Sequence, residues 1–289
     1  VNLTWDPIYS RNPEIDAREA MPGVNVISPS WFRLKDGEGN LANQADLNYV
    51  QWAHDQGYQV WALFSNDFDP DKTAQALSTS ESRANMIRQL LIYAELYQLQ
   101  GINIDFENVY LEDKNLVTQF VRELTSSLHK QGLTVSMDVT VRGGSAMWSL
   151  FYDRRTLAEI VDYMIVMAYD EHLAASPKAG SVSSLPWAEK GIADIIRVDG
   201  VPPEKLVLGV PFYTRLWTEK LVDGQVEVSS KTLSMSDVER IVEEKDLTPV
   251  YLEKEGQHYV EFLDEESKQK IWIEDERSME ARVELVKEY

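Results

Sequence analysis

The stretch Gln100-Gly101-Ile102-Asn103-Ile104-Asp105-Phe106-Glu107-Asn108 decides the fold of this chain. Apolar side chains alternate in it with amide or acidic ones, and successive side chains of a β-strand point to opposite faces. A strand here places Asn103, Asp105 and Glu107 on one face and three apolar side chains on the other. We expect this strand to form the wall of an active site, with its apolar face packed outward.

The two carboxyl groups of this strand suggest acid–base chemistry. Asp105 and Glu107 are two residues apart, which is about 6.5 Å along a strand. Two nearby carboxylates resist ionising together, so we expect a negative Asp105 to raise the pKa of Glu107. A carboxyl group that keeps its proton near neutral pH can act as a general acid. The alternative is a solvated strand face without chemistry.

Strand-like stretches alternate with helix-like ones over residues 1–217. The strand candidates are 1–9, 25–34, 59–66, 101–108, 134–140, 163–170 and 206–217, and helical spacing occurs at 45–56, 80–99, 115–130, 154–161 and 188–198. Repeated β-then-α units predict a parallel sheet of the α/β class. They fit a (β/α)8 TIM barrel better than an open doubly wound sheet. No Gly-x-Gly-x-x-Gly follows the first strand, which argues against a dinucleotide-binding fold.

The pattern changes after Trp217. Asp223-Gly224 is a hairpin signal between alternating stretches, and a helical stretch at 236–245 and two more alternating stretches follow. We therefore expect a catalytic barrel from 1–217 and 272–289, with a small α+β insertion at 218–271 after the seventh strand. An eighth strand is missing from the sequence, so we expect either an incomplete barrel or a last strand and helix that lie outside this chain.

Composition excludes several classes of function. The 289 residues carry a net charge of −20, which argues against nucleic acid as a partner and is compatible with a neutral polysaccharide. There is no cysteine, so disulfides and thiol catalysis are excluded. The four histidines are scattered without ligand spacing, so we expect no metal and no other cofactor. No apolar run approaches the roughly 20 residues of a membrane span.

The active site of a barrel forms at the C-terminal ends of its strands. The residues at the predicted strand ends are rich in carboxylates and aromatic rings, which suit the hydroxyl rims and C–H faces of sugars. They are Tyr9, Trp31, Asn66, Asp105, Glu107, Asp138, Met167, Tyr169, Asp170, Tyr213, Arg215 and Trp217. For the aromatic residues the alternative is plain packing, and for Tyr213 and Arg215 it is a structural pair.

Three segments in this order resemble glycoside hydrolase family 18. The family's Asp-Gly-x-Asp-x-Asp-x-Glu corresponds to residues 100–107, with Gln100 and Asn103 in place of the first two aspartates. Its Met-x-Tyr-Asp is matched by 167–170, and its Gly-x-Pro-x-Tyr-x-Arg by 209–215. The resemblance covers the whole chain and is strongest to bacterial N-acetylglucosaminidases of the spore cortex and cell wall.

The resemblance implies substrate-assisted catalysis, in which the N-acetyl group of the sugar is the nucleophile and an oxazolinium ion forms. It implies that Glu107 protonates the glycosidic oxygen, that Asp105 binds the acetamide N–H, and that Tyr169 holds the acetamide carbonyl. Asn103 replaces an aspartate that helps Asp105, and we expect its amide to hydrogen-bond Asp105 without sharing a proton. The other expected substrate-binding residues are Asp170, Met167, Tyr213, Arg215, Trp31, Tyr9 and Trp217.

The expected reaction is cleavage of the β-1,4 bond after N-acetylglucosamine in peptidoglycan, including spore cortex, with retention of configuration. We expect a monomer that acts outside the cell, in the cell wall or spore envelope of a bacterium, without a membrane partner. Two alternatives stay open. One is a chitinase that acts on chitin oligomers, and the other is a non-catalytic carbohydrate-binding protein on the same barrel, in which the acid supplied here by Glu107 is usually lost.

Overall fold

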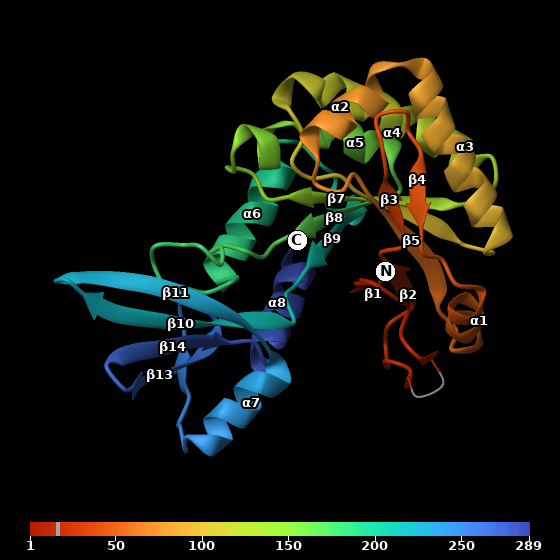
Figure 1. Cartoon of the computed structure of the whole chain (residues 1–289). Helices are drawn as coiled ribbons and strands as arrows, with labels where there is room; N and C mark the ends of the chain where they lie inside the picture. Colours follow the sequence, from red (N-terminus) through yellow and green to blue (C-terminus); the bar gives the residue numbers. More distant parts are fainter. Residues whose placement is uncertain (16–17) are drawn as a thin grey trace. The chain divides into compact units, whose positions relative to one another are not determined.

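The structure is a computed structural model, and it describes residues 1–15 and 18–289. The chain folds into two compact units. Unit 1 comprises Val1–Val166 and Asp199–Val207, and unit 2 comprises Met167–Val198 and Leu208–Tyr289. Figure 1 shows the order of the elements along the chain.

The larger sheet follows the chain in the order β1-β2-β5-β6-β7-β8-β9, as a (β/α)8 barrel requires. Its strands are β1 Leu3–Asp6, β2 Val26–Pro29, β5 Gln59–Ser65, β6 Gly101–Asp105, β7 Thr134–Thr140, β8 Tyr163–Met167 and β9 Leu206–Gly209. Two short strands, β3 Phe32–Leu34 and β4 Leu41–Asn43, lie off this path. The predicted barrel fold is confirmed. Within residues 1–15 and 18–289, no eighth strand joins the path.

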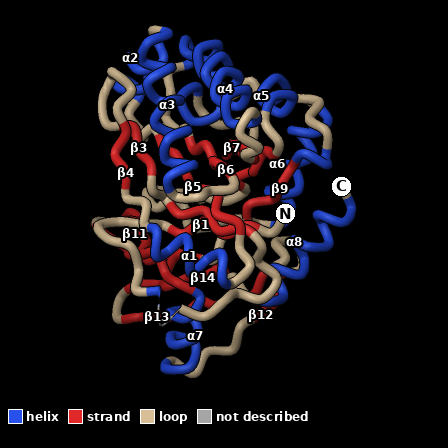
Figure 2. The backbone as a smooth tube through the Cα atoms, turned by 90° about the vertical axis from the view of Figure 1, so that its right-hand side faces the viewer, coloured by secondary structure: helices blue, strands red, loops and turns tan. Residues whose placement is uncertain are grey.

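The helices of unit 1 alternate with its strands, and Figures 1 and 2 show α2 to α5 on one side of β5, β6 and β7. They are α1 Leu47–Asp55, α2 Pro70–Ser78, α3 Ser80–Leu96, α4 Lys114–His129 and α5 Arg154–Ile160, with short helical turns at Leu111–Asp113, Ala146–Leu150 and Pro203–Lys205. Helix α2 is absent from the sequence prediction, although Asp69 caps it and Pro70 begins it.

The apolar face of β6 is buried, as predicted. Ile102, Ile104 and Phe106 are fully buried. The ring of Phe106 stacks on Phe120 of α4 with centroids 5.8 Å apart, and it meets Phe64 of β5 edge-on at 5.2 Å. This packing fixes the orientation of the strand, so its alternate side chains must point to the opposite face.

Unit 2 contains an antiparallel sheet in the order β11-β10-β14-β13-β12. Its strands are β10 Tyr213–Val222, β11 Gln225–Ser234, β12 Val250–Leu252, β13 Gln257–Asp264 and β14 Ser267–Ile273, and its helices are α6 Leu185–Arg197, α7 Met235–Glu244 and α8 Glu276–Glu288. Asp223 and Gly224 have φ angles of 49° and 78° between β10 and β11, so the predicted hairpin is confirmed. Buried Val238 of α7 packs with Leu233, Val260 and Ile271 of the sheet.

Two boundaries differ from the sequence prediction. The predicted strand 206–217 is divided into β9 and β10, because Pro211 between them lacks the N–H that a central strand needs. The antiparallel sheet therefore begins at Tyr213, and it includes β14, which the sequence prediction lacks. Strand β6 ends at Asp105, so Glu107 lies just beyond it and not within it.

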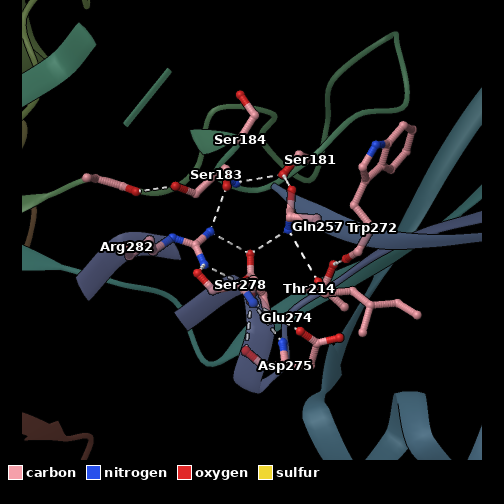
Figure 3. Close-up of polar contacts among 12 residues, drawn as sticks. Ser181, Ser183, Ser184, Thr214, Gln257, Trp272, Glu274, Asp275, Ser278 and Arg282 are labelled. Atoms are coloured by element: carbon pink, nitrogen blue, oxygen red, sulfur yellow. Dashed lines mark hydrogen bonds and ion pairs between the residues drawn. The ribbon is translucent and has the colours of Figure 1, made fainter. Parts of the chain in front are cut away.

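Unit 2 also encloses a polar network centred on Glu274, shown in Figure 3. The Glu274 carboxylate accepts hydrogen bonds from both Nη atoms of Arg282, at 2.6 and 2.9 Å, from Gln257 Nε2 at 2.8 Å and from Ser278 Oγ at 2.9 Å. Arg282 Nη2 also donates to the carbonyl of Ser183 at 2.7 Å. The network ties the start of α8 to the segment before α6.

Candidate active site

Two carboxyl groups, half-buried Asp105 and buried Asp138, lie toward the C-terminal ends of neighbouring strands of unit 1. Strands β6 and β7 are parallel, with Asn103 opposite Ser136 and Ile104 opposite Met137. The next residues along the two strands are Asp105 and Asp138, so their side chains share the face that carries Asn103 and Ser136. Asp138 is 1% exposed.

The side chain of Asn103 is fully buried, and both ends of its amide are occupied. Its oxygen accepts from Trp5 Nε1 at 3.1 Å and from Ser28 Oγ at 3.3 Å, and its nitrogen donates to Ser136 Oγ and to Asp138 Oδ1, each at 2.8 Å. The amide nitrogen has two hydrogens. The expectation that it bonds Asp105 is therefore wrong, because Ser136 and Asp138 take both.

Burial disfavours the charged form of both carboxyl groups. Burial raises the pKa of Asp105 to about 6, and the hydrogen bond with Glu107 opposes this rise. It also raises the pKa of Asp138 well above its ordinary value, with the nearby charge of Asp105 adding to the effect and hydrogen bonds from Asn103 and Trp5 opposing it. The Oδ1 atom of Asp105 is buried without a hydrogen-bond partner.

The main chain of Glu107 is fixed by Asn66, which directly follows β5 and which the sequence prediction treats only as a strand-end residue. Asn66 Oδ1 accepts from the Glu107 N–H at 3.0 Å, and Asn66 Nδ2 donates to the Glu107 carbonyl at 2.8 Å. Asn66 is fully buried and also bonds Thr73 Oγ1 at 3.0 Å. Glu107 therefore has a defined main-chain position although it lies just beyond the end of β6.

Tyr152 is a site residue that the sequence prediction lacks. Its hydroxyl donates to the carbonyl of Phe106 at 2.5 Å, between Asp105 and Glu107 in sequence. Burial raises its pKa, and the charges of Glu107 and Asp105 add to the effect. No motif marks Tyr152, because only the folding of the chain after β7 brings it to β6.

In unit 2, three predicted residues form a hydrogen-bonded group. The Asp170 carboxylate accepts from the Tyr213 hydroxyl and from Arg215 Nη2, the latter at 3.0 Å. Asp170 has a φ angle of 63°, which is uncommon for a non-glycine residue. The ring of Tyr169 meets that of Tyr213 edge-on at 6.3 Å, and Met167 ends strand β8. Burial raises the pKa of Tyr213, with its bond to Asp170 adding to the effect.

The predicted aromatic platforms divide into buried and exposed rings. Trp31 is 1% exposed, donates to Asn12 Oδ1 at 2.7 Å and packs edge-on against Tyr49, and Trp217 is fully buried. These two rings are core residues covered by protein, which corrects the expectation that they contact sugar. Tyr9 is 83% exposed on the β1–β2 connection.

Within residues 1–15 and 18–289, no group of His, Asp or Glu side chains has the arrangement of a metal site. In the same part of the chain, no helix combines the length and apolar character needed to cross a membrane.

Known proteins resemble this chain over most of its length. The profile of the family described as glycosyl hydrolases family 18 matches residues 25–289. The uncharacterized glycosylase YvbX of Bacillus subtilis is 25% identical over 276 residues, which cover 92% of this chain and 78% of the relative. The cortical fragment-lytic enzyme of Bacillus subtilis is 23% identical over 96% of this chain and 65% of that enzyme. The solved chitinase of Chromobacterium violaceum shares the fold with a TM-score of 0.81 at 21% identity, over 92% of this chain and 84% of that one.

Proposed function

The chain belongs to the glycosyl hydrolases of family 18, and from this premise we propose that it cleaves the β-1,4 bond after N-acetylglucosamine in peptidoglycan, including spore cortex. The observation that carries the proposal is the hydrogen bond of Asp105, at the end of β6, with Glu107 directly beyond it. A family-18 fold with an intact acid position favours a glycosidase over a carbohydrate-binding protein.

In the proposed mechanism, Glu107 donates its proton to the glycosidic oxygen as the bond to the sugar breaks. The acetamide oxygen of the same sugar attacks the anomeric carbon, and Asp105 accepts a hydrogen bond from the acetamide N–H and stabilises the positive oxazolinium ion. Glu107, now ionised, removes a proton from water, which opens the oxazolinium and restores the original configuration.

The fixed main chain of Glu107 supports its proposed role. General acid catalysis needs the acid within hydrogen-bond reach of the leaving oxygen, and small displacements are costly. The two bonds from Asn66 hold the carbonyl and N–H of Glu107, and Tyr152 holds the preceding carbonyl. We propose that Tyr169, Asp170, Tyr213, Arg215, Met167 and Tyr9 bind substrate, as the family resemblance implies.

The polymer itself is the finer part of the proposal. Similarity to the cortical fragment-lytic enzyme supports peptidoglycan, and we propose action by a monomer at the cell wall or spore envelope. The second candidate is a chitinase, because the chitinase of Chromobacterium violaceum has the same fold.

The test is product analysis by mass spectrometry after incubation with cortex peptidoglycan, vegetative peptidoglycan and chitin oligomers, with Glu107→Gln as the control. Fragments of peptidoglycan that end in reducing N-acetylglucosamine, absent with the variant, would support the proposal. Products from chitin oligomers alone would support the chitinase. Binding to any of these polymers without products would support the non-catalytic alternative.

A further inference from the structure

The carboxyl group of Asp138 is buried beside the proposed catalytic strand, and the mechanism above does not use it. We propose that Asp138 keeps a proton at neutral pH and donates it to Oδ1 of Asp105. Strand β7 would then supply the carboxyl partner that Asn103 cannot supply from β6. The inference rests on the proposed function, in which Asp105 is the negative group beside the oxazolinium ion, and it makes Asp138 a positioning residue.

The strand register places the two carboxyl groups side by side. Parallel pairing brings Ile104 opposite Met137, and Asp105 and Asp138 are the next residues along β6 and β7. The charge of Asp105 acts on Asp138, which agrees with this placement. Neighbouring strands are about 4.8 Å apart, and side chains at paired positions point to the same face. Two carboxyl groups at that spacing in a buried site cannot both ionise without a large cost.

The hydrogen-bond partners leave one place for a proton. Asp138 Oδ1 accepts from the amide nitrogen of Asn103 at 2.8 Å, and Asp138 also hydrogen-bonds Trp5. A protonated carboxyl group keeps acceptor capacity beside its O–H donor, so both bonds are compatible with a proton on Asp138. Asp105 Oδ1 is a buried acceptor without a donor, which is costly for a charged group. A proton on Asp138 gives that oxygen its donor. Asn103 cannot do so, because its two amide hydrogens bind Asp138 and Ser136.

The other charged groups around the pair do not replace this proton. Glu107 hydrogen-bonds Asp105 and lowers its pKa, but Oδ1 of Asp105 still has no hydrogen-bond partner. The hydroxyl of Tyr152 donates to the carbonyl of Phe106 and not to the pair. The guanidinium of Arg154 donates instead to the carbonyls of Thr140 and Val141 and to the hydroxyl of Ser149. The raised pKa values of Asp105 and Asp138 agree with a pair that carries one negative charge near neutral pH.

Two substitutions of Asp138 separate a proton donor from a structural acceptor. In Asp138→Asn, the amide oxygen can still accept from Asn103 while its N–H groups replace the proposed proton. In Asp138→Val, the donor is lost. With a chromogenic N,N′-diacetylchitobioside as the probe, we expect the acid limb of kcat/KM to stay in place for Asp138→Asn. For Asp138→Val we expect the acid limb to move to higher pH by about one unit. The reason is that a hydrogen bond to a carboxylate lowers its pKa, and Asp105 would lose that bond.

A uniform loss of activity at every pH in Asp138→Val, with the limb unmoved, would overturn the proposal. An acid limb displaced equally in Asp138→Asn would also overturn it, because the site would then need a negative charge. The matched control is Asp162→Asn, which changes a partly exposed aspartate that binds the opposite, N-terminal end of β7.

A second measurement needs no catalysis. Carbon-13 NMR of aspartate-labelled protein should show the Asp138 carboxyl protonated at pH 7, and its midpoint should fall in Asp105→Asn, where the neighbouring charge is absent. An ionised Asp138 at pH 7 would refute the proposal even if the enzyme is active. A protonated, coupled Asp138 in a protein that cleaves none of the polymers would instead leave the pairing intact and refute the proposed function.

Discussion

Replacement of Arg282 by methionine tests the buried network of unit 2 most sharply. The side chains of Arg282 and Glu274 are 4% and 1% exposed, and the guanidinium supplies two of the four hydrogen bonds to the carboxylate, the others coming from Gln257 and Ser278. Methionine has similar length but no charge or donor. Arg282→Met therefore leaves Glu274 buried without its counter-ion, and it frees the carbonyl of Ser183.

The magnitude follows from the cost of an uncompensated buried charge. Removing one partner of a buried ion pair costs about 3–5 kcal/mol, whereas replacing both partners by neutral groups costs much less. Burial raises the pKa of Glu274, although the hydrogen bond and the charge of Arg282 lower it. Loss of Arg282 raises it further, so the cost of Arg282→Met should shrink as the pH falls and Glu274 takes up a proton.

The assay is urea and thermal unfolding at pH 7 of four proteins: the original chain, Arg282→Met, Glu274→Gln and the double variant. We expect a fall in Tm of roughly 10 °C for Arg282→Met. We expect the double variant to lose less stability than the sum of the losses in the two single variants. Arg277→Met is the matched control, because Arg277 is half-exposed on the same helix α8. A loss below about 1 kcal/mol for Arg282→Met, or strictly additive single effects, would refute the reasoning.

Three further predictions concern unit 1. Glu107→Gln should lose nearly all turnover and keep ligand binding, since the amide cannot donate the proton; normal kcat would exclude Glu107 as the acid. Asn66→Ala should lower kcat about tenfold or more with little change in KM, because the main chain of Glu107 loses two hydrogen bonds; a change in KM alone would contradict this. Because the pKa of Asp105 is about 6 in the folded protein and 3.8 ordinarily, its contribution to stability is present below pH 3.8 and lost as the pH rises through 6. Urea unfolding should therefore show that the free energy of unfolding of the original chain falls between pH 4 and pH 7. The fall should be smaller in Asp105→Asn by up to about 3 kcal/mol, and equal falls in the two proteins would contradict the assignment.

The alternation in residues 100–108 was enough to predict the buried face of β6 and the polar face opposite it. Ile102, Ile104 and Phe106 are fully buried because a period of two admits only one register once the apolar side is covered. The repeated β-then-α order was likewise enough for the barrel, because strand order in such a fold follows the chain.

The contacts between residues that are far apart in sequence could not be predicted in this way. Asp138 is 33 residues from Asp105, and only the pairing of β6 with β7 makes them neighbours. The true partners of Asn103 were missed for the same reason. The burial of Trp31 and Trp217 could not be read from the sequence, because a tryptophan at a strand end suits a packed core and a sugar platform equally.

Proton NMR of the first product from an N-acetylglucosamine oligomer would test the central claim most directly. At early times, before mutarotation, the configuration of the new reducing end shows whether the bond was hydrolysed with retention. Substrate-assisted catalysis by Glu107 and Asp105 predicts the β-anomer first, and no product from Glu107→Gln. The α-anomer as the first product would contradict the account, because it requires direct attack by water in place of the acetamide oxygen.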